Sequence, residues 1–271
     1  MTTQAVADLC WAINTPSLIE GEDVMPCPEI TPGDIDADHL ERFIDQRQGS
    51  YRVGRYFETL IEYWLRHVRK LDVTARGMQL RDGKITVGEI DFLYRDEQDA
   101  LVHCETTVKF FLCVPGHSPS EFPGPNANDN YESKLTKLFE DQLVRSERFI
   151  PEVELRLGIM KGMLFYRAGN PTADVPPRLS PAHQRGAWLR VDEIESLGGD
   201  AFAIATKPNW LAPVVDADVM SRDEVGRALE SHFEKSDQPI MLSSRDATDV
   251  RTEVQRLFVV SPTWPLTGAP A

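Results

Sequence analysis

The sequence predicts an α/β protein. Three observations carry this prediction: an amphipathic helical stretch at residues 53–70, three strand-like runs that follow it, and a second helix that leads into another strand. This order favours one sheet covered by helices, with a crossover helix returning the chain to the same sheet. We expect an N-terminal helix and connector at residues 1–36, a core at 37–190 and a C-terminal extension packed on the core at 191–271.

The composition is that of a globular protein. Apolar residues make up 41% and charged residues 27% of the 271 residues. No apolar run reaches the roughly 20 residues of a membrane span, and the N-terminus lacks the pattern of a signal peptide. The cysteines have no zinc-type spacing, and Cys104 and Cys113 fall in or beside a strand-like run as small apolar side chains. We therefore expect a reduced, cytoplasmic protein with no membrane partner.

The net charge of −14 argues against a general nucleic-acid binder, because such proteins usually present a basic face to phosphate. Net charge says nothing about local distribution, so a basic groove remains compatible with this balance. Most of the acidity is expected to lie on a solvated surface.

The first half of the chain begins with helices. Residues 4–13 and 37–48 each predict a helix, and the Pro-rich segment MPCPEITPGD connects them. Residues 53–70 carry apolar side chains at helical spacing along one stripe. Glu58 lies at the edge of that stripe, so it is expected to point toward whatever the helix packs on.

Three strands are expected next, at residues 74–80, 85–94 and 100–114. Asp82-Gly83 between the first two is a strong signal for a tight hairpin, and a short polar loop joins the second to the third. The three runs therefore predict an antiparallel meander.

A second amphipathic helix is predicted at residues 131–148, with Gln142 inside its apolar stripe. The strand at 154–166 follows it, which suits a crossover back into the sheet. Later elements are expected as follows: strands at 186–190, 201–206, 239–242 and 256–260, and a helix at 222–235.

Charged residues interrupt two of the meander strands. Asp91 lies on one face of the second strand, and Glu105 and Lys109 share a face of the third. Carboxylates on adjacent strands can converge on Mg²⁺, with Mn²⁺ as an alternative, because this ion prefers oxygen ligands. Lys109 would then hold the attacking water or stabilise charge at phosphorus, and Glu58 would supply a further ligand or a supporting hydrogen bond.

Two purely structural interpretations of these charged residues stay open. A solvated sheet face would show the same alternation of polar and apolar residues. A buried ion-pair network between the acids and Lys109 would also explain them, although carboxylates in a covered sheet are costly unless they are paired or bind a cation.

The arrangement resembles the PD-(D/E)XK phosphodiesterase superfamily, which has the restriction-endonuclease-like fold. Asp91 matches the Asp of its motif, Lys109 the Lys, Glu58 the Glu of the preceding helix and Gln142 a Gln that some branches carry on the crossover helix. The sequence departs from the pattern where Thr107, two residues before Lys109, replaces the acid. The nearest acid, Glu105, stands about 6.6 Å further along the strand on the same face.

A second resemblance covers nearly the whole chain. The stretches VGRYFETLIEYWL, VGEIDFLYRD, HCETTVKFFL and EVQRLFVVSPTWP, in this order, resemble the bacterial family catalogued as domain of unknown function 1853. That resemblance implies the nuclease-like fold without naming a substrate.

These observations predict a Mg²⁺-dependent nuclease or phosphodiesterase acting on nucleic acid, with DNA favoured over RNA. Asp91, Glu105, Lys109 and Glu58 are the expected catalytic residues, and Asp91 and Glu105 the metal ligands. Gln142, Lys134 and Asn126 are candidates for substrate binding, although simple exposure on a helix is the commoner role for a lysine such as Lys134 and a capping or turn role explains Asn126 at least as well. The alternative is an inactive relative that binds nucleic acid or a protein.

Overall fold

The structure is a computed structural model of the chain and describes residues 3–47, 52–118, 121–127, 129–170, 175–196 and 198–265. It divides into two compact units, the first comprising Met1–Val108, Ser133–Lys161 and Arg178–Ala182, and the second the remaining segments. Strands β3 and β4 run through both units. The three-part division expected from the sequence stays a prediction.

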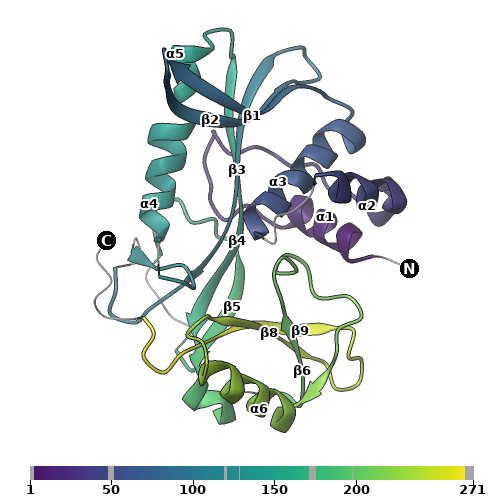
Figure 1. Cartoon of the computed structure of the whole chain (residues 1–271), viewed down its shortest axis with the longest axis vertical. Coiled ribbons are helices and arrows are strands. Elements are labelled where there is room, and N and C mark those ends of the chain that lie inside the picture. The colour runs from purple at the N-terminus through teal and green to yellow at the C-terminus, as the bar shows by residue number, and fades with distance from the viewer. Residues whose placement is uncertain are drawn as a thin grey trace. The chain divides into compact units, whose positions relative to one another are not determined.

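The first unit places helices on both faces of a sheet: α1 to α3 on one side and α4 with α5 on the other (Figure 1). Its elements are α1 (Gln4–Asn14), η1 (Pro32–Asp34), α2 (Ala37–Gln46), α3 (Val53–Tyr63), η2 (Trp64–Val68), β1 (Asp72–Asp82), β2 (Ile85–Arg95), β3 (Leu101–Leu112), α4 (Tyr131–Thr136), η4 (Lys137–Gln142), α5 (Arg145–Phe149) and β4 (Leu155–Arg167). This is a layered arrangement in which each face of the sheet is covered, as buried strands require.

The predicted meander is confirmed. β1 pairs antiparallel with β2, and β2 pairs antiparallel with β3. The pairing of Asp82 with Ile85 closes the β1–β2 hairpin, and Gly83 adopts a φ of 60° in its turn. Such a positive φ explains why the Asp-Gly signal identified this turn.

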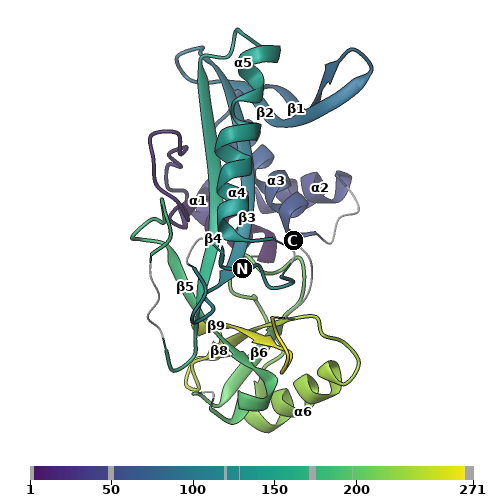
Figure 2. The ribbon, with the colours of Figure 1, turned by 90° about the vertical axis from the view of Figure 1, so that its left-hand side faces the viewer.

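The predicted crossover is confirmed as well. The Glu154 amide donates to the Leu101 carbonyl, and the Cys113 amide donates to the Phe165 carbonyl. The two bonds join residues at nearly the same sequence offset, so β3 and β4 run parallel. In Figure 2, α4 and α5 lie along β3 and β4.

Both long predicted helices contain a wider turn that the sequence analysis did not anticipate. The Arg69 amide donates to the Trp64 carbonyl, and the Leu143 amide donates to the Leu138 carbonyl, each across five residues. These bonds define the π-helical segments η2 and η4. Amphipathic spacing alone does not distinguish such a turn from a regular helix, and π segments are frequent at functional sites.

The second unit continues the sheet. Its elements are β5 (Gln184–Arg190), η5 (Val191–Ser196), β6 (Ala201–Ala205), β7 (Met220–Ser221), α6 (Arg222–Phe233), β8 (Ile240–Arg245) and β9 (Glu253–Val260). β5 pairs parallel with both β4 and β9, and β8 pairs antiparallel with β9 and with β6. Helix α6 packs Val225 and Leu229 into the apolar core of this unit.

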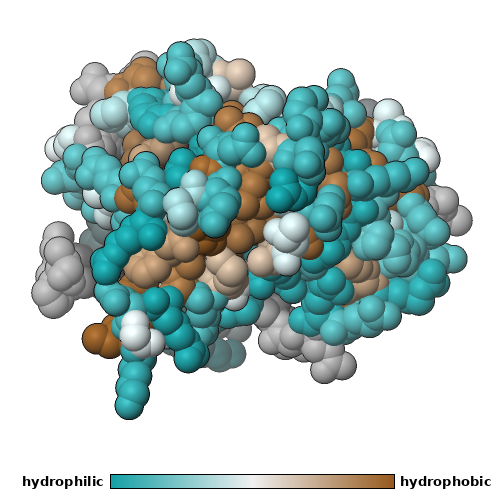
Figure 3. Space-filling model, turned by 90° about the horizontal axis from the view of Figure 1, so that it is seen from above, coloured by the Kyte–Doolittle hydropathy of each residue, from teal (hydrophilic) through white to brown (hydrophobic). Residues whose placement is uncertain are grey.

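The described strands form one sheet of nine in the order β1-β2-β3-β4-β5-β9-β8-β6-β7. The α/β class predicted from the sequence is therefore confirmed, but the sheet is larger than the expected core. None of the described helices combines the length and apolar character that a membrane crossing requires. Hydrophilic side chains cover most of the face shown in Figure 3, in keeping with the high charge content.

Gly162 in β4 marks a close approach of two backbones, and it generates a first prediction. Its φ is 146°, and a Cβ built on it would lie 1.7 Å from the Lys109 carbonyl oxygen. Because backbone atoms cannot move aside cheaply, Gly162→Ala is expected to lower the free energy of unfolding by about 3 kcal/mol or more. Denaturant unfolding measures this change.

Gly158→Ala on the same strand is the matched control. Its added Cβ would meet only the Leu138 side chain, at 3.3 Å. A loss for Gly162→Ala no larger than that of the control would contradict the close approach.

Candidate functional site

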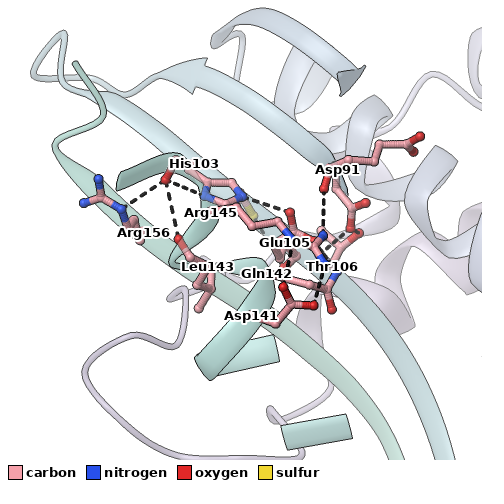
Figure 4. Close-up of polar contacts among 12 residues, drawn as sticks. Asp91, His103, Glu105, Thr106, Asp141, Gln142, Leu143, Arg145 and Arg156 are labelled. Atoms are coloured by element: carbon pink, nitrogen blue, oxygen red, sulfur yellow. Dashed lines mark hydrogen bonds and ion pairs between the residues drawn. The ribbon is translucent and has the colours of Figure 1, made fainter. Parts of the chain in front are cut away.

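The candidate site forms where β2 and β3 separate. Their backbone pairing ends at Phe92 and Cys104, and Asp91 and Glu105 are the next residues beyond that pair. The Thr106 amide donates to Asp91 Oδ2 at 2.8 Å, and the Glu105 carboxylate accepts a hydrogen bond from the Asp91 backbone. Each carboxylate thus satisfies an amide of the opposite strand at the point where the ladder stops (Figure 4).

This geometry holds two acids close together in a poorly hydrated space. Burial and the charge of Glu105 raise the pKa of Asp91 to about 7. Burial also raises the pKa of Glu105 to about 7. Glu58 on α3 joins them, since burial and the charge of Asp91 raise its pKa to about 7. The three carboxyl groups therefore disfavour one another's ionised forms.

Glu105 is fully buried and held at both oxygens. His103 Nε2 lies 2.9 Å from Oε1, and Gln142 Nε2 donates to Oε2 at 2.5 Å. Gln142 reaches the site from η4, the π-helical segment of the crossover. The structure thus brings together Gln142 and Glu105, two of the residues that the sequence singled out, and rules out a solvated strand face for Glu105.

His103 continues the network away from the cavity. Its Nδ1 lies 2.9 Å from Ser146 Oγ, which also accepts a hydrogen bond from Arg156 Nε at 3.0 Å. Burial and the charge of Arg156 lower the pKa of His103 to about 4, so the ring is neutral at pH 7. Glu105, His103 and Ser146 follow the order of a hydrolase relay, but all three are fully buried. His103 and Ser146 therefore orient Glu105, and none of the three side chains has access to a substrate.

A cavity of about 340 Å³ opens beside these strands in the first unit. Acidic and basic side chains both line it: Glu58, Glu89, Asp91, Arg47, Arg55 and Arg76. Asp91 Oδ1 and the Glu58 carboxylate have no hydrogen-bond partner within the described part of the chain. These two groups are therefore available to a ligand in the cavity.

The arginines of this cavity were not anticipated by the sequence analysis. Arg47 and Arg76 are anchored by Glu62, which lies one turn after Glu58 on α3 and is 2% exposed. Arg47 Nε donates to Glu62 at 2.8 Å, Arg76 Nε lies 3.2 Å away, and Arg66 Nε donates at 2.9 Å. Burial raises the pKa of Glu62, but the hydrogen bonds and charges of these arginines outweigh it and lower the pKa below its ordinary value.

The remaining predicted residues lie elsewhere. Lys109 belongs to the second unit, where its Nζ donates to Asp129 Oδ2 at 3.0 Å. Asn126 is an exposed residue of that unit, and Lys134 is half-buried on α4. Thr107 is half-buried on β3. Lys109 is thus paired with Asp129 and not with the acids of the meander, which weakens the interpretation as one ion-pair network.

The donor set at the cavity suits a cation held by few protein ligands. Among the described residues, no group of three or more His, Cys, Asp or Glu side chains is arranged to hold a metal ion. Mg²⁺ usually takes one or two carboxylates and keeps several waters, so two open carboxylates are compatible with it. The metal site predicted from the sequence, Asp91 with Glu105, stays a prediction.

The Glu62 cluster predicts a pH dependence of stability. Because the folded pKa of Glu62 lies below its ordinary value of 4.5, its contribution is present above pH 4.5 and is lost as the pH falls through the folded value. At pH 7, Glu62→Gln is expected to cost about 2–3 kcal/mol, since it leaves three guanidinium groups without their carboxylate. Thermal or urea unfolding between pH 3 and 7 (roughly the range in which carboxylates titrate) checks this.

Glu97→Gln provides the control, because Glu97 is 50% exposed in its pair with Arg69 and should contribute under about 1 kcal/mol. A cost of Glu62→Gln that does not shrink toward acid pH would contradict the proposed pairing.

Comparison with known proteins gives one match. The family model of the Domain of unknown function (DUF1853) matches residues 7–260. No curated protein and no solved structure matches the chain significantly. The match spans most of the sequence, including every element around the cavity. The chain therefore belongs to the family Domain of unknown function (DUF1853).

Proposed function

We propose that this protein is a Mg²⁺-dependent phosphodiesterase that acts on nucleic acid. The observation that carries the proposal is a pair of open carboxylates, Asp91 Oδ1 and Glu58, which line one cavity; the charge of Asp91 raises the pKa of Glu58, and burial with the charge of Glu105 raises that of Asp91. Strongly perturbed acids in a cleft mark functional sites, because a protein gains no stability from leaving them together unpaired.

The order of elements supports a restriction-endonuclease-like core. Helix α3 carries Glu58, the antiparallel meander carries Asp91 and Glu105, and the crossover segment carries Gln142 before the parallel strand β4. This is the arrangement that the PD-(D/E)XK resemblance implies. The additional strands of the second unit extend that core.

The residues present fit a divalent cation. Asp91 and Glu58 offer oxygen ligands in the cavity, and Glu105 adds negative potential directly behind Asp91. When bound, Mg²⁺ would polarise a phosphoryl oxygen and lower the pKa of a bound water. His103 and Gln142 fix the Glu105 carboxylate, so the field at Asp91 is preorganised.

A binding module without catalysis is the second candidate. Thr107 occupies the position of the motif acid, and Lys109 is engaged by Asp129. Both observations favour a relative that retains the cavity but not the chemistry. The role of Lys109 as a base stays a prediction.

Metal binding provides the first test. Mg²⁺ and Mn²⁺ are expected to bind wild-type protein in calorimetry and to raise its melting temperature, because the ion relieves carboxylate repulsion. Affinity should rise from pH 6 to 8, since the ligands ionise near a pKa of about 7. Asp91→Asn should abolish the response. Asp82→Asn, at the hairpin tip, is the control.

Asp91→Asn also has an expected effect without metal. A raised folded pKa costs stability at pH values above the unfolded pKa of 3.8, and that cost is complete above about 7. The variant should therefore gain about 1 kcal/mol at pH 8 and nothing near pH 4, because Asn still accepts from Thr106. A loss of stability at pH 8 would indicate a structural role and sink the proposal.

A nuclease assay separates enzyme from binder. With Mg²⁺, wild-type protein is expected to cleave single-stranded, duplex or branched DNA faster than RNA, and Asp91→Asn should lose at least about 100-fold in rate. Lys109→Ala tests the proposed base. Equal cleavage by wild type and Asp91→Asn would point to a contaminant and contradict the assignment.

A further inference from the structure

The cavity beside β2 is lined by side chains of both charges. Glu58, Glu89 and Asp91 contribute carboxylates, and Arg55 on α3 and Arg76 on β1 contribute guanidinium groups. Both guanidinium charges lower the pKa of Glu58, which places them within electrostatic reach of the acids. They do not form an ion pair with them, since Glu58 and Asp91 keep their open oxygens.

Arg76 is held in place by two side chains, Glu62 outside the cavity lining and Thr59 within it. Its Nε lies 3.2 Å from Glu62, and its Nη2 donates to Thr59 Oγ1 at 3.4 Å. Its side chain is 32% exposed, so part of the guanidinium remains accessible. A planar fork fixed along one edge is the arrangement that binds phosphate oxygens with its other edge.

The cluster around Glu62 carries an excess of positive charge. Three guanidinium groups, those of Arg47, Arg66 and Arg76, share one carboxylate, which leaves an excess of two positive charges. Arg55 adds a further charge at the cavity, and its side chain has no hydrogen-bond or ion-pair partner among the described residues. Guanidinium charge that Glu62 does not offset therefore remains beside the acids of the cavity.

We propose that Arg55 and Arg76 bind a phosphodiester group of the substrate strand, in the same cavity as the carboxylates that take the cation. A phosphate in this cavity would contact the guanidinium donors and a metal-neutralised acid pair. This inference rests on the proposed function for the identity of the strand, but anion binding by the arginines does not require the metal.

Binding of a fluorescent single-stranded oligodeoxynucleotide, measured by anisotropy in EDTA and then in Ca²⁺, tests the inference. Arg55→Gln and Arg76→Gln are each expected to weaken binding about 5- to 100-fold in both conditions. Each should also reduce the slope of log affinity against log salt by about one. Arg81→Gln, on the same strand as Arg76 but outside the cavity, should leave both unchanged.

Two further variants keep the result interpretable. Arg55 has no hydrogen-bond or ion-pair partner among the described residues, so Arg55→Gln should fold with a melting temperature close to that of the wild type, and Arg76→Lys should restore part of the binding lost in Arg76→Gln. Competition with inorganic phosphate distinguishes a free-phosphate site, which phosphate would block at equal or lower concentration than the oligonucleotide, from a strand site.

The outcomes separate the two proposals. Unchanged oligonucleotide binding in Arg55→Gln and Arg76→Gln, or preferential binding of inorganic phosphate, would overturn the inference. Loss of binding in these variants, together with no Ca²⁺ effect and no change in Asp91→Asn, would support the arginine site while contradicting the metal-dependent function.

Discussion

The structure around the cavity depends on the separation of β2 and β3 beyond Phe92 and Cys104. Where the ladder stops, an inward-facing amide needs an acceptor, and the neighbouring carboxylates supply one. Asp91 and Glu105 are thereby fixed side by side by the backbone itself. Their closeness is a consequence of strand geometry. The remaining polar residues of the site interact with these two acids through hydrogen bonds and charge.

Two glutamates on one helix show how differently the chain treats buried acids. Glu62 is surrounded by guanidinium groups and its pKa is lowered, whereas Glu58, one turn earlier, has its pKa raised to about 7. An uncompensated buried carboxylate costs several kcal/mol, and Glu62 on the same helix shows that neighbouring arginines can offset this cost. Glu58 and Asp91 thus keep open carboxylate oxygens among the described residues, whereas Gln142 donates to Glu105 and His103 lies within hydrogen-bond distance of it.

Much of this could be predicted from the sequence because it is local. The alternation of side chains along neighbouring strands predicted that Asp91 and Glu105 could converge. The helical spacing of apolar residues predicted that Glu58 lies at the edge of one buried stripe and Gln142 within the stripe of the crossover helix. Ser146, Arg156 and Arg76 could not be found in this way, because a contact such as that of Arg76 with Glu62 joins separate elements and arginine has no positional signature. The nine-stranded sheet was not predicted for a similar reason, since parallel pairing of β5 with β9 joins strands far apart in sequence.

The global charge was the least informative property of the chain. A net charge of −14 argued against a nucleic-acid partner, yet the cavity brings Arg47, Arg55 and Arg76 together beside its acids. At the ionic strength of a cell, charges beyond about 8 Å are largely screened, so a ligand in the cavity responds to its walls and not to the distant surface. An acidic protein can therefore hold a phosphate group, provided that its own acids near that group are neutralised by a cation. In the proposed function, the open pair Asp91 and Glu58 and the anchored Arg76 would meet these two requirements with one ligand complex, a phosphate together with its metal ion.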